Sequence, residues 1–379
     1  MRLRRYVRRA GAPIGRPLRR SAIGLRTRGW PPHSRLFIAQ EGAEWVLAYE
    51  ARQLRKLAGK LGIQVGPDRW VNGVGGQSVF HESQFTLLLH DFERRGNNLG
   101  FAYFHGRPGT PGFPEFDACY EALRRRHGEI DRVQVTNRAM EALVRETGIA
   151  AEKIHRIPIG IDRETFRVRT PRARADSRRE LELPDSAFVV GSFQKDGVGW
   201  GEGLEPKLIK GPDVLVAVAE RLRERVPELW FLLTGPSRGY VKTGLERAGV
   251  PYRHFFLPDV EAVATAYEAI DLCLVTSREE GGPKAALEAM SIGVPLVTTR
   301  VGQAADLVRH GKNGWMVDVG DVDGLVEWSA HVAEAPRVEL EQVLRAGAAT
   351  AMENSYEALT PAWRGLLDGF VAIPEPGQG

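Results

Sequence analysis

Cysteine is almost absent from this chain of 379 residues, which has two, Cys119 and Cys273. They are far apart in sequence and lie in apolar or helical surroundings, so neither a disulfide framework nor a cysteine metal site is indicated. No histidine and cysteine cluster has the spacing of a zinc site. No uncharged apolar run approaches the ~18 residues that a membrane-spanning helix needs. We therefore expect a globular, metal-free protein of the reducing cytoplasm.

Acidic residues are missing from the first 40 positions, whereas the first 28 contain ten arginines. Setting these ten aside leaves 42 basic against 48 acidic residues, so the body is mildly acidic and nucleic-acid binding by it is disfavoured. Residues 1–34 are expected to form a basic, disordered tail. Three interpretations of it stay open: a solvated arm, a segment attracted to anionic lipid at the inner membrane face, or an organelle-targeting peptide.

Beyond Trp30 the chain alternates apolar strand patterns with helical patterns. This alternation predicts an α/β protein with two doubly wound, parallel, Rossmann-like domains, whose ligands bind beyond the carboxyl ends of the strands. We expect an N-terminal domain at 35–172, a linker at 173–184 and a second domain at 185–354. The basic stretch 167–180 is expected to be exposed at this hinge, and a last helix is expected over 355–372.

The stretch 277–295 combines two carboxylates with a glycine-rich turn that begins a helix. The apolar segment before it predicts a buried strand, Pro283 suits the first helical position, and Gly293 ends a helix over 283–292. The helix N-terminus offers unpaired N–H groups and the positive end of the helix dipole, which favours an anion. Glu280 and Glu288 would hold hydroxyl groups on either side of a bound diphosphate. A solvated amphipathic helix is the simpler alternative, but the strand, turn and helix context favours a phosphate site.

This segment resembles the E-x7-E signature of the family 4 retaining, group 1 glycosyltransferases of GT-B fold, in which two Rossmann-like domains face a central cleft. The matching residues are Glu280, Gly281, Gly282, Glu288, Ala289, Met290, Gly293 and Pro295. The resemblance is strong over 185–325 and weak in the N-terminal half. It implies that the chain crosses back at its end, so that the helix at 355–372 packs on the N-terminal domain.

Lys210 and Gly211 are similar to the family's Lys-Gly step, whose lysine neutralises the leaving diphosphate. The arginine that usually accompanies this lysine is missing, and Lys195 is our candidate for the second cation. His105 looks like the family's strand-end histidine, which faces the reacting sugar, and Gly42 matches a glycine of the first loop loosely. The resemblance thus implies catalytic roles for Glu280, His105 and Lys210. The residues implied in donor binding are Glu288, Gly281, Gly282, Pro283, Lys284, Lys195 and Gly42.

Asp321 and Asp323 spell the D-x-D motif of metal-dependent glycosyltransferases, but their context predicts the start of a helix with an aspartate N-cap. We therefore expect a metal-independent hexosyltransferase-type enzyme that needs no cofactor beyond its nucleotide-diphosphate sugar. Its acceptor would be a glycan, a lipid-linked molecule or a small molecule. Two alternatives remain: a nucleotide-sugar epimerase or phosphorylase on the same fold, and a non-catalytic nucleotide-sugar-binding protein.

Overall fold

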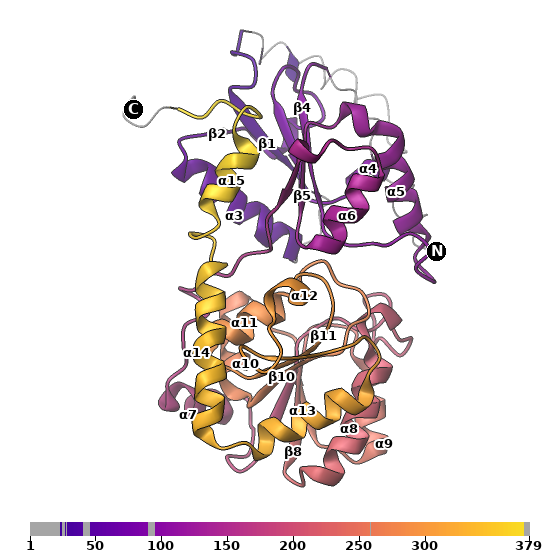
Figure 1. Cartoon of the computed structure of the whole chain (residues 1–379), viewed down its shortest axis with the longest axis vertical. Helices are drawn as coiled ribbons and strands as arrows, with labels where there is room; N and C mark the ends of the chain where they lie inside the picture. The colour runs from indigo at the N-terminus through magenta and orange to yellow at the C-terminus, as the bar shows by residue number, and fades with distance from the viewer. Residues whose placement is uncertain are drawn as a thin grey trace. The chain divides into compact units, whose positions relative to one another are not determined.

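The computed structural model divides the chain into two compact units (Figure 1). Unit 1 comprises residues 1–158 and 359–379, and unit 2 comprises residues 159–358. The structure describes residues 23–24, 27, 29–40, 46–89, 95–257 and 259–374. All ten arginines of the basic tail, and Gly42, lie outside the described residues. Each unit is built on one six-stranded parallel sheet, which confirms the predicted α/β class with two doubly wound sheets.

The sheet of unit 1 has the order β2-β1-β3-β4-β5-β6, and its neighbouring strands are parallel. Residues 36–38 of the first strand are fully buried, as expected where helices cover both faces of a parallel sheet. The strands are β1 (Arg35–Ala39), β2 (Gln64–Val65), β3 (Ser78–His81), β4 (Asn98–Tyr103), β5 (Arg132–Val135) and β6 (Ile154–Arg156), and the helices between them are α3 (Val46–Lys60), α4 (Thr86–Leu89), α5 (Pro114–Arg126) and α6 (Arg138–Glu146).

Unit 1 is completed by a segment from the far end of the sequence, which contains α15 (Thr360–Leu367). Ser78 and Asn98 donate side-chain hydrogen bonds to the carbonyl of Phe370, and Arg132 donates to the carbonyls of residues 366 and 368. Trp363 packs edge-on against Phe80 with ring centroids 5.9 Å apart. The helix is shorter than the expected 355–372 because proline at its first turn disfavours helical backbone before it.

The sheet of unit 2 has the order β12-β11-β10-β7-β8-β9, again parallel throughout. Its strands are β7 (Phe188–Ser192), β8 (Leu229–Thr234), β9 (Tyr252–Phe255), β10 (Leu272–Val275), β11 (Leu296–Thr299) and β12 (Trp315–Val317). Its helices are α7 (Pro171–Glu180), α8 (Pro212–Arg225), α9 (Gly239–Ala248), α10 (Val260–Ala269), α11 (Lys284–Ile292), α12 (Ala304–Leu307), α13 (Val322–Glu334) and α14 (Arg337–Glu353).

Successive residues of β10 enter two different cores, because side chains alternate between the faces of a strand. Cys273 and Val275 pack with residues of α10 and α11, whereas Leu272 and Leu274 pack with residues of α8, α9 and α13. In Figure 1, α10, α11 and α14 accordingly lie on one side of this sheet, and α8, α9 and α13 lie on the other. The central strand is therefore enclosed by helices on both faces.

The stretch 167–180 corrects one prediction, because it lies within unit 2 and is not a hinge, although most of its side chains are exposed. Residues 171–180 form α7, which is part of unit 2, and the side chain of Arg178 is fully buried. Arg178 donates hydrogen bonds to the carbonyls of Pro184, Asp185, Ala187 and Ala269 and forms an ion pair with Asp271. The boundary between the units follows Pro158, so residues 159–184 belong to unit 2 instead of ending the first domain and linking it to the second.

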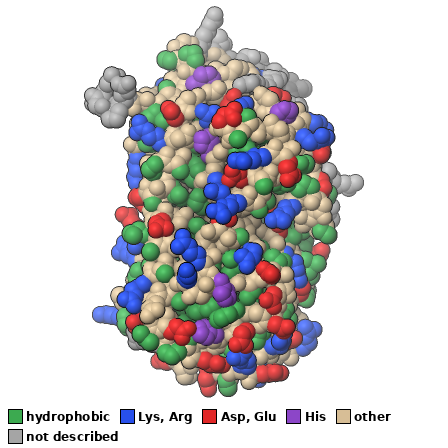
Figure 2. Space-filling model, in the orientation of Figure 1, with side chains coloured by type: hydrophobic (Ala, Val, Ile, Leu, Met, Phe, Trp, Pro, Cys, Tyr) green, Lys and Arg blue, Asp and Glu red, His purple; other side chains and the backbone are tan. Residues whose placement is uncertain are grey.

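Charges of both signs are distributed over the face of the molecule drawn in Figure 2. Figure 2 shows Lys and Arg side chains interspersed with Asp and Glu over the visible face, as expected for a body with nearly balanced charge. Both cysteines are buried, and neither forms a disulfide. Among the described residues, no helix is both long and apolar enough to cross a bilayer.

The buried arginine of α7 gives a test of this architecture. We expect Arg178→Ala to lower the free energy of unfolding by about 3–5 kcal/mol, because the substitution leaves Asp271 and several carbonyls without their buried donor. Arg179→Ala is the matched control. The side chain of Arg179 is 76% exposed, so its loss should lower the free energy of unfolding by about 1 kcal/mol or less. Urea unfolding followed by tryptophan fluorescence measures both. Equal stability of the two variants would mean that the stretch behaves as a linker.

Candidate functional site

Three loops meet at the carboxyl edge of the unit 2 sheet. They follow the neighbouring strands β11, β10 and β7, and they comprise residues 300–303, 276–283 and 193–211. The third loop ends in a short 3-10 helix at Leu208–Lys210 before α8 begins. This edge is where parallel α/β sheets bind their ligands.

An ion pair joins two of these loops. Lys210 Nζ lies 2.6 Å from Glu280 Oε1, and the two side chains are 19% and 12% exposed. The hydroxyl of Ser277 contacts the same Oε1 atom at 2.9 Å and Gln194 Oε1 at 3.0 Å. Gln194 in turn donates from Nε2 to the carbonyl of Lys210 at 2.7 Å. The carboxylate of Glu280 and the ammonium of Lys210 are therefore held in one hydrogen-bonded network.

The glycines of this edge allow the loops to approach closely. A Cβ atom on Gly211, which has φ of 62°, would lie 2.0 Å from the carbonyl oxygen of Thr276. A Cβ atom on Gly302 would lie 2.7 Å from the carbonyl oxygens of residues 280 and 281. One on Gly282 would lie 2.7 Å from Gln303 Oε1. Glycine at 282 is thus required by packing inside the protein as well as by the expected approach of a phosphate.

Gln303, which is fully buried, also holds the turn before α11 in place. Its backbone N–H donates to the carbonyl of Gly281 at 3.1 Å, and its side-chain Oε1 accepts from the N–H of Ile159 at 2.8 Å. Pro283 is the N-cap residue of α11 and offers no side-chain hydrogen bond to the first helical N–H groups. The helix ends at Gly293, with φ of 83°, as expected. These features place the helix N-terminus next to Glu280, in an arrangement suited to an anion.

Glu288 lies in the second turn of α11 and is 9% exposed. Its Oε2 atom accepts a hydrogen bond of 2.9 Å from the hydroxyl of Tyr267, which is fully buried in α10. Burial, with the charge of Glu288 adding to it, raises the pKa of Tyr267 well above its ordinary value. The tyrosine therefore stays protonated as a donor, and it holds one oxygen of the carboxylate.

A second ion pair joins the loop after β10 to the first turn of α8. Arg278 forms two hydrogen bonds of 2.7 Å with the carboxylate of Asp213, in the first turn of α8. Partial burial works to raise the pKa of Asp213, but the hydrogen bonds and charge of Arg278 outweigh it and lower this pKa. The backbone N–H groups of residues 278 and 279 also donate to the carbonyl of Ile209. The two loops that supply Lys210 and Glu280 are thereby joined by side chains and backbone.

The other predicted site residues lie in the 193–211 loop, at the first residue of α11 and in unit 1. Lys195 Nζ lies 4.1 Å from the centre of the Trp200 ring, and Lys284 Nζ lies 3.3 Å from the hydroxyl of Tyr356. His105 is in unit 1, two residues after the end of β4, where its ring packs edge-on against Phe116 at 5.4 Å. The structure thus brings Lys210 and Glu280 together. It places Glu288 within α11 and the glycine turn directly before this helix.

The glycine-rich loop that carries Trp200 is anchored to the start of α9. The backbone N–H groups of residues 239 and 240 donate to the carbonyls of residues 202 and 203, and the hydroxyl of Ser237 donates to those of residues 199 and 201. Below it, Asp196 and Arg238 form a fully buried ion pair of 3.0 Å. Burial raises the pKa of Asp196, and the charge of Arg238 opposes this rise. Trp200 itself is 56% exposed.

The D-x-D aspartates have structural partners. Asp321 is the N-cap of α13, as the sequence indicates, and accepts from the N–H of Gly324 at 2.8 Å. Asp323 forms an ion pair with Arg221 of α8.

Sequence reasoning missed four residues that shape the site: Gln194, Ser277, Tyr267 and Gln303. Gln194 occupies the region where the family's second cation is expected, and its neutral amide contacts the network around Lys210 and Glu280. Ser277 lies three residues before Glu280, a spacing that could have suggested their hydrogen bond. Tyr267 and Gln303 are distant in sequence, and no local pattern pointed to them.

Known proteins resemble the chain in sequence. Residues 204–349 match the family described as glycosyl transferases group 1. D-inositol 3-phosphate glycosyltransferase of Segniliparus rotundus is 30% identical over 262 residues, which are 65% of this chain and 55% of that protein. The enzyme of the same name from Xylanimonas cellulosilytica is 34% identical over 199 residues, or 50% of this chain and 45% of that protein. The chain thus spans about half the length of the curated relatives it matches.

Solved structures resemble it in fold. Anabaena HepE in complex with UDP and glucose superposes with a TM-score of 0.72 at 17% identity, covering 89% of this chain and 100% of that one. Sucrose-phosphate synthase of Thermosynechococcus elongatus gives a TM-score of 0.71 at 17% identity, covering 88% of this chain and 98% of that one. These comparisons confirm the resemblance to group 1 glycosyltransferases. The chain therefore has the GT-B fold, and residues 204–349 are similar to the group 1 glycosyltransferases.

Proposed function

We propose that this protein is a retaining, metal-independent glycosyltransferase that moves a sugar from a nucleotide-diphosphate sugar to an acceptor. The observation that carries the proposal is the Lys210–Glu280 ion pair beside the N-terminus of α11, with Glu288 in the next turns of the same helix. A cation, a helix dipole and two carboxylates are the groups that a sugar, a diphosphate and a ribose require. The HepE structures with UDP and with UDP-glucose support this class of donor.

Each side chain has a defined part in the proposed reaction. Glu280 accepts hydrogen bonds from hydroxyls of the donor sugar, and Glu288 accepts those of the ribose. Lys210 and the N–H groups at the start of α11 stabilise the negative charge that grows on the diphosphate as the glycosidic bond breaks. The sugar then carries oxocarbenium character. His105 of unit 1 is proposed to face the reacting sugar.

Charge neutralisation without a metal follows from the same groups. Lys210 supplies one positive charge, and the dipole of the nine-residue helix α11 supplies the equivalent of about half a charge. Gln194 takes the place of a second cation and contributes a neutral amide. We therefore propose that the donor nucleotide is the sole non-protein group required. Acceptor class and attraction of the basic tail to anionic membranes stay predictions.

A thermal-shift panel of UDP, GDP, ADP and their sugars is the first test, because a ligand that binds the folded state raises the melting temperature. Analysis of the products with the selected donor then separates the alternatives. Release of nucleoside diphosphate with transfer of the sugar supports the proposal. Conversion of the donor to its epimer, or phosphorolysis, indicates the other reactions on this fold, and binding without turnover indicates a non-catalytic protein.

The two carboxylates give a second prediction. Glu280→Gln and Glu288→Gln keep the size of the side chain but lose its charge, so we expect each to lower turnover of the selected donor tenfold or more. This corresponds to a loss of about 1.5–3 kcal/mol, the range for a hydrogen bond to a charged group. Glu353→Gln, at an exposed glutamate of the same unit, is the matched control and should leave turnover unchanged. Full activity in both site variants would refute their roles.

The metal question gives a third prediction. We expect EDTA to leave turnover intact, whereas Lys210→Ala should reduce it at least a hundredfold, the effect of removing one preorganised charge-stabilising group. Lys312→Ala, at an exposed lysine of unit 2, serves as the control for a lost positive charge. Loss of activity in EDTA with recovery on adding manganese would instead support a metal at Asp321 and Asp323.

A further inference from the structure

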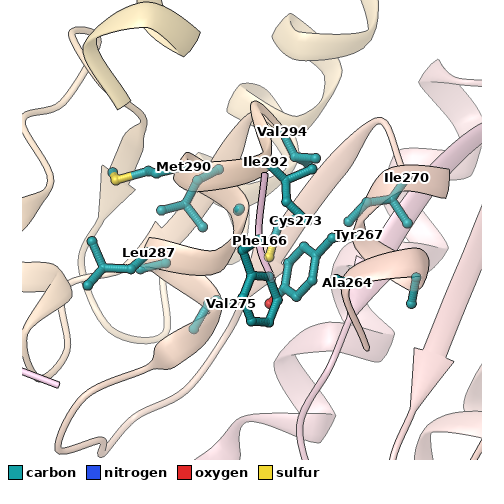
Figure 3. Packing of buried hydrophobic residues seen from close by; sticks show 14 of the residues in the cluster. Phe166, Ala264, Tyr267, Ile270, Cys273, Val275, Leu287, Met290, Ile292 and Val294 are labelled. Atoms are coloured by element: carbon teal, nitrogen blue, oxygen red, sulfur yellow. The ribbon is translucent and has the colours of Figure 1, made fainter. Parts of the chain in front are cut away.

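Tyr267 places a hydroxyl group inside an apolar core. Its ring packs edge-on against Phe193, with centroids 4.6 Å apart, and against Phe166, with centroids 6.0 Å apart. Figure 3 shows Tyr267 beside Phe166 and Cys273 within this cluster. Phenylalanine would fill the same space without a polar atom, and burying a hydroxyl is unfavourable unless it finds a partner. The hydrogen bond from the hydroxyl of Tyr267 to Glu288 Oε2 offsets the cost of burying this hydroxyl.

That hydrogen bond fixes the orientation of the carboxylate. The terminal torsion of a glutamate side chain is soft, so an unanchored carboxylate turns easily about its last bond. A donor at Oε2 stops this rotation and gives both oxygens of Glu288 a fixed direction. The hydrogen bond from Tyr267 is made to Oε2, and an ionised carboxylate has about four acceptor positions in all.

The same ring also connects the two ends of the site. Phe193, which packs on Tyr267, directly precedes Gln194, and Gln194 bonds to Ser277 and to the carbonyl of Lys210. A displacement of the Tyr267 ring would thus shift both Glu288 and the loop that holds Lys210. Tyr267 is well placed to keep the ribose side and the diphosphate side in register.

We propose that Tyr267 is a positioning residue that orients Glu288 toward the vicinal hydroxyls of the donor ribose, and thereby makes the site select ribonucleotides over deoxyribonucleotides. This inference rests on the proposed function, in which Glu288 holds those hydroxyls. It assigns selectivity for the sugar of the nucleotide to a side chain that itself lies outside the binding surface.

The test compares Tyr267→Phe with the unaltered full-length protein. The probes are whichever of UDP, GDP and ADP raises the melting temperature most, and its 2′-deoxy counterpart, with dissociation constants measured by calorimetry. We expect the unaltered protein to prefer the ribonucleotide, and Tyr267→Phe to reduce this preference by about five- to tenfold, the factor that one hydrogen bond represents. The ribonucleotide should weaken while the deoxynucleotide changes little.

Tyr252→Phe is the matched control. The hydroxyl of Tyr252 donates to Glu246 at 2.5 Å, so this variant removes another tyrosine–glutamate hydrogen bond of unit 2 away from the three loops. We expect its selectivity to equal that of the unaltered protein. If Tyr267→Phe lowers the melting temperature and weakens both nucleotides equally, the tyrosine is merely structural and the inference is overturned.

Glu288→Gln distinguishes this inference from the function on which it rests. If Glu288→Gln abolishes the preference for the ribonucleotide and Tyr267→Phe does not, the role of Tyr267 fails while that of Glu288 stands. If the unaltered protein shows no preference, or Glu288→Gln keeps it, the ribose role of Glu288 fails and the inference fails with it. Absence of binding by all three nucleoside diphosphates would overturn both the inference and the proposed donor.

Discussion

Close backbone contact at the carboxyl edge of the unit 2 sheet is the constraint on which the candidate site depends. The turn at 280–282 lies so near Gly302 that a side chain at position 302 would overlap the carbonyl oxygens of the turn. The backbone N–H of Gln303 donates a hydrogen bond to the same turn. Gly211 approaches the end of β10 from the other side. Three loops are thereby locked together by their main chains, and the direction of Glu280 follows from that fit.

Electrostatics then act on a scaffold that is already in place. Lys210 and Glu280 are mostly buried, so their attraction is screened less than that of a surface pair. A bound diphosphate would compete with Glu280 for the ammonium of Lys210, because both offer negative oxygens. In the proposed function, the carboxylate keeps the lysine in place until the donor binds. Preorganisation of this kind lowers the free-energy cost of binding.

Much of the fold followed from local patterns in the sequence. A strand was correctly predicted before Glu280, and the start of α11 near Pro283 and its end at Gly293 were predicted within one residue, because turn and capping residues act locally. The E-x7-E segment likewise pointed to the family that residues 204–349 match. The hinge at 167–180 was wrong, since a run of arginines gives no sign that Arg178 is buried and binds Ala269 and Asp271, which lie 91 and 93 residues farther along the chain. Contacts such as Tyr267 with Glu288 and Gln303 with Ile159 arise from tertiary structure and have no local signature.

Unit 1 is assembled from two segments that are separated by the whole of unit 2. The strands β3 and β4 hold the carbonyl of Phe370 through Ser78 and Asn98, across almost three hundred residues of sequence. During synthesis, residues 159–358 leave the ribosome before this last contact becomes available, so unit 2 has its complete sequence first. Until residues 359–379 have been synthesised, part of the unit 1 sheet stays uncovered. Loop closure over such a span is entropically costly, and for this reason docking of α15 is expected to be a late step of folding.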